Sequence, residues 1–217
     1  MARRPWLAAI FPLTLLAGCQ APPPPIHPSL DPANAKIDPS KIHPVTREMS
    51  AEAEAMSAKK LPEFRLRSTD GTVVTNADLV KIPTVLYFVN LECPCCVDSN
   101  PLFRDLAKAG MPIRVIGVAD GPLDKAKKWV KANETGYPVL ADPLQTLMRA
   151  LKIRNGVYFA VISPNGSISK IEPGVSADVM AQTVARLGEI GEFSAPRLNW
   201  DKAPERLTSG CAFSWTE

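Results

Sequence analysis

Three cysteines, Cys93, Cys95 and Cys96, follow directly after an apolar run at residues 84–91. The run is rich in β-branched and aromatic residues, which is typical of a buried central strand. A helical pattern begins just after the cysteines, with apolar residues recurring on one face from Leu102 onward. We therefore predict that the cysteine cluster lies where a strand gives way to the N-terminus of a helix.

A helix N-terminus favours ionised sulfur, because its first N–H groups are unpaired and its dipole is positive there. Cys93 and Cys96 are spaced C-x-x-C, so a cap at Cys93 and a first-turn Cys96 can close a disulfide with little backbone movement. Pro94 suits the first helical position, where no N–H is needed. We predict a redox couple with Cys93 as the exposed nucleophile and Cys96 as the resolving partner beneath it. The competing interpretation is a structural disulfide.

This cysteine step, with Pro101 five residues after Cys96, resembles the thioredoxin superfamily. The resemblance covers about Leu61 to Ile190 and is strongest to the redoxin branch, which includes peroxiredoxin-like proteins of the alkyl hydroperoxide reductase and thiol-specific antioxidant (AhpC/TSA) type. It implies a thioredoxin-like α/β fold, with a mixed central sheet flanked by helices, an N-terminal β-hairpin and a redoxin-type insertion. It also implies that Pro94 and Pro101 support the site and that no cofactor is bound.

The remaining patterns agree with strands that alternate with helices. Asp70-Gly71 is a turn signal between two short β-runs and predicts a hairpin. Further strands are expected at 113–119, 139–141, 157–162 and 167–171, and helices at 46–60, 123–135, 144–151 and 176–189.

Several positions depart from the patterns of these families. Thioredoxins usually carry Trp before the first cysteine, where this chain has Glu92, and a cis-proline where it has Val157. The peroxiredoxin proline and hydroxyl positions are occupied by Leu86 and Asn90. The typical peroxide pocket is therefore not visible in the sequence. A peroxidase that uses Cys93 or Cys96, with Cys211 as the resolver, is nevertheless the alternative to a thiol-disulfide oxidoreductase, and Cys95 and Cys211 are the candidate additional redox residues.

The N-terminal sequence predicts export of the protein and its anchoring to a membrane. Residues 1–18 have a short positive region and an apolar stretch of signal-peptide length. They lead into Leu16-Ala17-Gly18-Cys19, which resembles the bacterial lipobox and implies cleavage before Cys19 and its lipidation. Residues 19–60 are expected to form a Pro-rich tether and a short helix, and 61–191 the redoxin domain. The apolar tail, 192–217, is expected to pack on that domain.

The predicted location is therefore the cell envelope, on the periplasmic side. Gln20 follows Cys19 where bacterial lipoproteins retained in the inner membrane carry aspartate, so the resemblance favours the outer membrane. The formal net charge is only +3, which gives no electrostatic support for nucleic-acid binding. Expected partners are a protein disulfide or a small peroxide, an external thiol reductant, and the membrane through the lipid.

A metal-binding role is the third interpretation. Soft thiolates suit Cu(I), so Cys93, Cys95 and Cys96 are weak candidate ligands of a non-enzymatic protein. Copper chaperones of the Sco type, which share this fold, also use a late histidine. Here the only histidines are His27 and His43, both in the tether, where we expect solvated side chains.

Overall fold

The computed structural model describes residues 43–216, so the predicted signal peptide, Cys19 and His27 lie outside the described residues. In the described part, the strands are β1 (His43–Pro44), β2 (Arg65–Ser68), β3 (Val73–Thr75), β4 (Thr84–Val89), β5 (Arg114–Ala119), β6 (Val139–Ala141), β7 (Phe159–Ile162), β8 (Ile168–Glu172) and β9 (Thr208–Ser209). The helices are α1 (Arg47–Glu54), α2 (Pro94–Ala107), α3 (Leu123–Asn133), α4 (Thr146–Ala150) and α5 (Ala177–Gly191), with short 3-10 turns η2 (Asn76–Leu79) and η3 (Ser214–Thr216).

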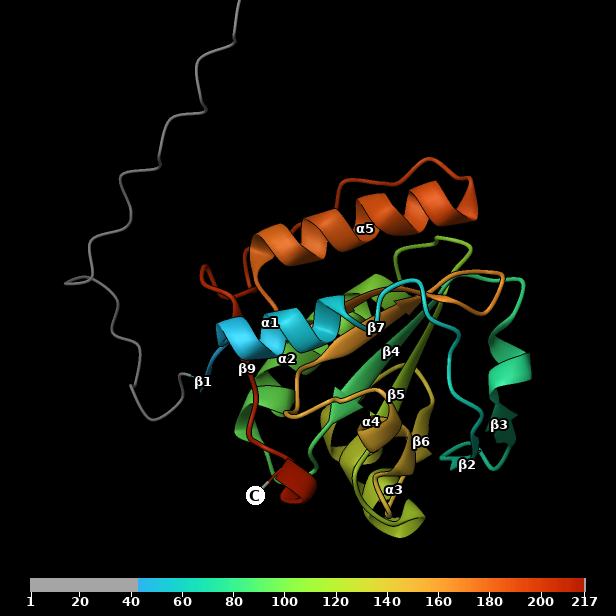
Figure 1. The fold of residues 1–217 in the computed structure, drawn as a ribbon, viewed down its shortest axis with the longest axis vertical. Coiled ribbons are helices and arrows are strands. Elements are labelled where there is room, and N and C mark those ends of the chain that lie inside the picture. The colour runs from blue at the N-terminus through green and yellow to red at the C-terminus, as the bar shows by residue number, and fades with distance from the viewer. Residues whose placement is uncertain (1–42, 217) are drawn as a thin grey trace, which may run out of the picture. The chain divides into compact units, whose positions relative to one another are not determined.

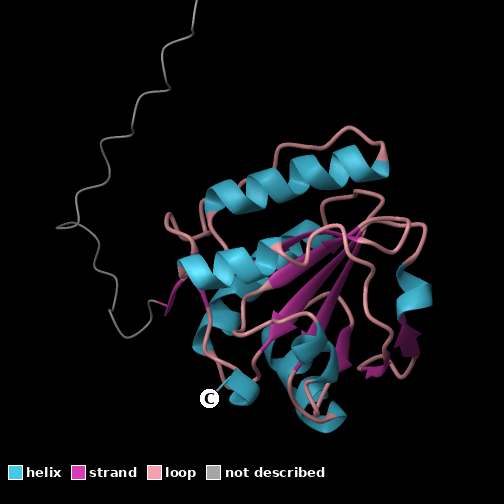
Figure 2. Ribbon diagram, viewed as in Figure 1, coloured by secondary structure: helices cyan, strands magenta, loops and turns pink. Residues whose placement is uncertain are grey.

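The described strands form a mixed seven-stranded sheet in the order β3-β2-β6-β5-β4-β7-β8, and β1 pairs with β9 apart from it (Figure 1). The central strand β4 runs parallel to β5 and antiparallel to β7. Helices lie on both faces of this sheet (Figure 2). The predicted thioredoxin-like α/β fold, including the hairpin of β2 and β3, is confirmed.

Every residue of β4 is buried, because the sheet is covered on both faces. Its side chains alternate between two apolar cores. Val85, Tyr87 and Val89 face the core that contains α2, α3 and α5, whereas Leu86 and Phe88 face the core that contains α1 and α4. The predominantly apolar composition of β4 is therefore explained by its central place in the sheet.

Two elements begin later than their patterns predict. The expected helix at 144–151 starts at Thr146, because the Asp142 carboxylate accepts from the N–H groups of residues 146–148 and caps it there. The expected strand at 157–162 starts at Phe159, because Val157 has a φ of 68° and so cannot continue an extended backbone.

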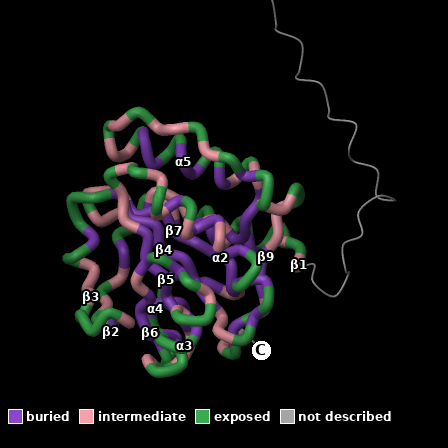
Figure 3. Tube along the Cα trace, turned by 180° about the vertical axis from the view of Figure 1, so that it is seen from behind, coloured by how far each residue is buried: buried purple, intermediate pink, exposed green. Residues whose placement is uncertain are grey.

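The tail returns across the domain (Figure 3), where Trp200 and Phe213 are buried. Its strand β9 pairs with β1, which brings His43 opposite Ser209. His43 is therefore part of a small β-ladder, whereas a solvated tether residue was expected. No helix within residues 43–216 has the length and apolar character needed to cross a bilayer.

Candidate active site

The predicted junction between strand and helix is present at Cys93. The residue is the N-cap of α2, Pro94 occupies the first turn, and the N–H of Cys96 donates to the Cys93 carbonyl at 3.1 Å. Pro101 lies inside the same helix. The sulfur at 93 therefore meets the positive end of the helix dipole.

Cys93 is not exposed, contrary to the sequence-based expectation. Only 1% of the residue is accessible, and Cys96 is fully buried. The reason is the tail: the backbone N–H of Cys211 donates to Cys93 Sγ at 3.0 Å, so the tail covers the sulfur. The structure thus brings Cys211 to the predicted couple although 114 residues separate it from Cys96 in sequence.

The surroundings of Cys93 lower its pKa to about 5. The largest cause is a hydrogen bond from the Cys96 thiol, which outweighs the opposing effect of burial. The thiol and the N–H of Cys211 add further donors. Cys93 is therefore a thiolate at neutral pH, which is the form that acts as a nucleophile.

The pKa values of the three neighbouring thiols are raised, whereas that of Cys93 is lowered. Burial, followed by the charge and contacts of Cys93, raises the pKa of Cys95 to about 11 and that of Cys211 to about 12. The pKa of Cys96 is also raised well above its ordinary value, chiefly by burial. No disulfide joins the four cysteines that the structure describes. One thiolate among three protonated thiols is an arrangement suited to thiol exchange.

A loop before β7 forms the floor of the site. A Cβ atom on Gly156 would lie 2.5 Å from Cys96 Sγ, so only glycine allows the loop to approach the buried sulfur this closely. Val157, at the position where thioredoxins carry the proline, holds its strained φ with its N–H bonded to the Phe88 carbonyl. Arg154 anchors the loop to α1 through a bidentate contact with Glu52.

Two polar residues join the site without a sequence signal for this role. Asn90 donates to the carbonyl of Ala212 at 3.0 Å and accepts from the N–H of Glu92. His43 Nε2 lies 3.7 Å from Cys211 Sγ. Both contacts depend on how the tail and the tether return to the domain, and no local motif indicates that.

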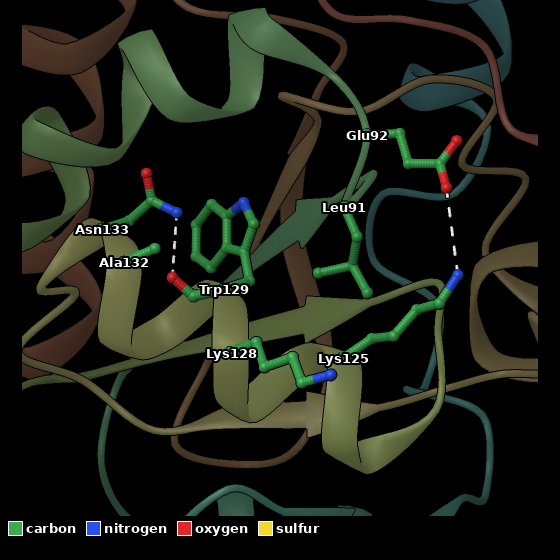
Figure 4. A pocket seen from close by; sticks show the side chains of 7 residues that line it. All are labelled: Leu91, Glu92, Lys125, Lys128, Trp129, Ala132 and Asn133. Carbon is green, nitrogen blue, oxygen red and sulfur yellow. Dashed lines mark hydrogen bonds and ion pairs between the residues drawn. The ribbon is translucent and has the colours of Figure 1, made fainter.

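An open pocket of 330 Å³ lies between the loop before Cys93 and α3 (Figure 4). Its lining consists of Leu91, Glu92, Lys125, Lys128, Trp129, Ala132 and Asn133. Glu92 is exposed and points to Lys125 at 3.9 Å, so its charge is partly compensated. No cysteine lines this pocket.

Within residues 43–216, no group of three or more His, Cys, Asp or Glu side chains is arranged to hold a metal ion. The weak Cu(I) prediction for Cys93, Cys95 and Cys96 therefore gains no support.

The lowered pKa of Cys93 predicts a pH-dependent stability. Because the folded pKa of about 5 lies below the ordinary value of 9.0, ionisation favours the folded state. The contribution is fully present above pH 9, decreases as the pH falls below 9, and is lost as the pH falls through 5. We expect the reduced protein, in urea titrations, to lose stability from pH 8 to pH 5 relative to Cys93→Ser. A constant difference between the two proteins would contradict this assignment.

The comparison with Cys93→Ser is needed because buried carboxyl groups act in the other direction. Burial raises the pKa values of Asp120, Asp142 and Glu172, and their protonation favours the folded state at low pH. They are present in both proteins, so the difference in unfolding free energy isolates Cys93.

Solved structures share this fold at low sequence identity. DsbF from Mycobacterium tuberculosis is 21% identical, with a TM-score of 0.52, covering 57% of this chain and 94% of its own. Peroxidoxin BcpB from the same organism is 21% identical, with a TM-score of 0.52, covering 64% and 98%. The thioredoxin domain of a thiol-disulfide oxidoreductase from Bacteroides vulgatus is 17% identical, with a TM-score of 0.53, covering 60% and 96%.

Among curated proteins, no sequence matches the chain. The model of the AhpC/TSA family, however, matches residues 58–171, which is more than half of the chain and includes β2 to β7, all of β8 except its last residue, and the three clustered cysteines. This agrees with the redoxin resemblance of the sequence and with the fold described above. The chain therefore belongs to the AhpC/TSA family.

Proposed function

We propose that the protein is a thiol-disulfide oxidoreductase in which Cys93 and Cys96 form the redox couple. The observation that carries the proposal is the single low-pKa sulfur at the start of α2, in hydrogen-bond contact with the Cys96 thiol one turn on. Family membership and the fold shared with DsbF support it. Neither assigns the reaction.

The proposed cycle uses only these two sulfurs and an external substrate. The Cys93 thiolate attacks one sulfur of a disulfide, and the other sulfur leaves as a thiol after taking a proton. Cys96 then loses its proton and attacks Cys93, which releases the second thiol and closes the Cys93–Cys96 disulfide. Burial is the main cause of the raised pKa of Cys96, but the negative charge at Cys93, which raises it further, is absent in the mixed disulfide. An external thiol later reduces the pair.

Thiol counting tests the couple directly. We expect wild type to lose two titratable thiols reversibly on mild oxidation, and Cys96→Ser to accumulate a mixed disulfide at Cys93. Peptide mapping should assign the bond to residues 93 and 96, and Cys95→Ser should oxidise like wild type. If wild type forms no reversible bond between 93 and 96, the proposed couple is wrong.

The second candidate is a thiol peroxidase, and the burial of Cys93 favours it. A sulfur that is 1% accessible under the tail is easier for a small hydroperoxide to reach than for a folded protein. The thiolate would attack the peroxide oxygen, releasing an alcohol or water and leaving a sulfenic acid. Cys96 or Cys211 would then attack that sulfur, releasing water and forming a disulfide.

Against the peroxidase, Arg154, which lies in the loop beneath the site, is held by Glu48 and Glu52 and so is not available to polarise a peroxide. Parallel assays separate the two reactions: hydroperoxide consumption coupled to a thiol reductant, and reduction of a protein disulfide. Rapid turnover with hydroperoxide alone would assign the peroxidase, and the reverse pattern the oxidoreductase.

We also propose a lipid anchor at Cys19 and a location on the periplasmic side of the envelope. The supporting observation is the sequence Leu16-Ala17-Gly18-Cys19. Labelled palmitate should enter wild type but not Cys19→Ala in a bacterial host. Equal labelling of the two proteins would exclude lipidation at this cysteine.

A further inference from the structure

The tail supplies groups to Cys93 that neither β4 nor α2 provides. We call residues 209–212 the tail segment. Its Cys211 N–H donates to Cys93 Sγ at 3.0 Å, and the Cys211 thiol hydrogen-bonds to the same sulfur. A site built from a strand and a helix terminus alone would lack both donors.

The N–H of Cys211 is held in place from both sides. The N–H of Gly210 donates to the carbonyl of Gly156 at 2.8 Å, and the N–H of Gly156 donates to the carbonyl of Cys211 at 2.9 Å. Asn90 fixes the next carbonyl, that of Ala212. The tail segment is therefore paired to the loop under the site, and the donor is positioned before any charge develops.

This pairing requires glycine at position 210. A Cβ atom there would lie 2.8 Å from both the carbonyl carbon and the carbonyl oxygen of Gly156, which are backbone atoms. A larger residue must push the tail segment away from the loop, and the N–H of Cys211 moves with it. Gly210 thus offers a way to displace the donor without changing any cysteine.

We propose that Cys211 is a positioning residue for Cys93, whose N–H and thiol hold the sulfur at 93 in its ionised form together with the helix terminus. Hydrogen bonds to a charged group are the strong class, so losing the N–H is expected to raise the pKa of Cys93 by about one unit or more. The tail segment then belongs to the active site itself.

The hydrogen bond from the Cys211 N–H to Cys93 Sγ also links the docking of the tail segment to the redox state of Cys93. This second inference rests on the proposed Cys93–Cys96 couple. The N–H of Cys211 meets an anion in the dithiol form and a neutral sulfur in the disulfide form. It therefore favours the reduced state. By reciprocity, reduction tightens the docking of the tail segment. Displacing the segment should shift the equilibrium with glutathione about tenfold toward the disulfide, or about 30 mV toward a more negative potential.

Other titratable groups near Cys93 must stay unchanged in the test. They are Tyr87 from β4, Cys95 and Cys96 from α2, Glu92 before the helix, and His43 beside Cys211. Among residues 43–216 the three other thiols have raised pKa values, and Cys19→Ala removes the remaining thiol of the full chain, so ionisation of a thiol below pH 8 in that background reports Cys93.

The test follows thiolate absorbance near 240 nm against pH in the reduced full-length protein with Cys19→Ala. Gly210→Ala should raise the pKa of Cys93 by about one unit or more. Cys211→Ala, which keeps the N–H and loses the thiol, should give a smaller rise. Ala212→Ser is the matched control, because this side chain is exposed and the carbonyl that accepts from Asn90 is retained. An unchanged pKa in both Gly210→Ala and Cys211→Ala would overturn the proposal.

Hydrogen exchange gives a second measurement if Gly210→Ala folds poorly. The amide of residue 211 should exchange about tenfold faster in Cys93→Ser than in reduced wild type, because the anionic acceptor is gone. Equal exchange would also overturn the proposal. If the Cys93–Cys96 disulfide never forms, the proposed couple fails, but the pKa and exchange results still decide the role of Cys211.

Discussion

Cys93→Ser is expected to lower thiol-dependent turnover by about a thousandfold or more, whichever oxidant proves to be the substrate. The hydroxyl of serine does not ionise near neutral pH, so the attacking anion is lost. The measurement is kcat/KM in both the hydroperoxide and the protein-disulfide assay. The rate in wild type should rise with pH through about 5, following the pKa of Cys93.

Cys95→Ser provides the matched control, because it replaces a neighbouring thiol of raised pKa in the same helical turn. We expect it to retain most of the activity. Comparable losses in the two variants would show that the cluster is needed as a whole, and would refute the assignment of Cys93 as the single nucleophile.

Phe213→Ala is expected to reduce the free energy of unfolding by about 3 kcal/mol or more, a loss typical of emptying a fully buried aromatic position. Phe213 has no accessible surface and packs in the core that contains α1 and α4. Its N–H also donates to the carbonyl of Arg154 at 2.9 Å. Urea titration of the reduced protein measures the effect.

Leu144→Ala is the control for that measurement, since Leu144 is 78% exposed and its truncation should change stability by no more than about 0.5 kcal/mol. If Phe213→Ala leaves the global transition unchanged while the tail becomes sensitive to protease, the tail unfolds separately from the domain. That result would contradict the integral packing described here.

Local patterns predicted the fold because each depends on neighbouring residues. The buried run at 84–91 became β4, and the step from Cys93 to Pro94 became the start of α2. The period of apolar residues and the chemistry of a helix cap are readable without long-range contacts. The family resemblance supplied the order of the remaining strands.

The burial of Cys93 by the tail segment could not be predicted in the same way. The resemblance of the tail suggested Cys211 as a resolver, but the N–H contact to Cys93 depends on a backbone pairing between residues 154–156 and 210–213. Such pairing leaves no periodic trace in a loop. The prediction that His43 is a solvated tether residue failed for a related reason. The pairing of His43 with Ser209 produces no periodic pattern in the sequence from which it could be predicted.

The short ladder between β1 and β9 has a spatial consequence if Cys19 carries a lipid. His43 lies 24 residues after Cys19 and contacts Cys211, so a tether from a lipid at Cys19 would end beside Cys211. A fully stretched chain of that length spans no more than about 86 Å. With a lipid at Cys19, a thiol donor that reduces Cys93 would have to act within this distance of the membrane surface.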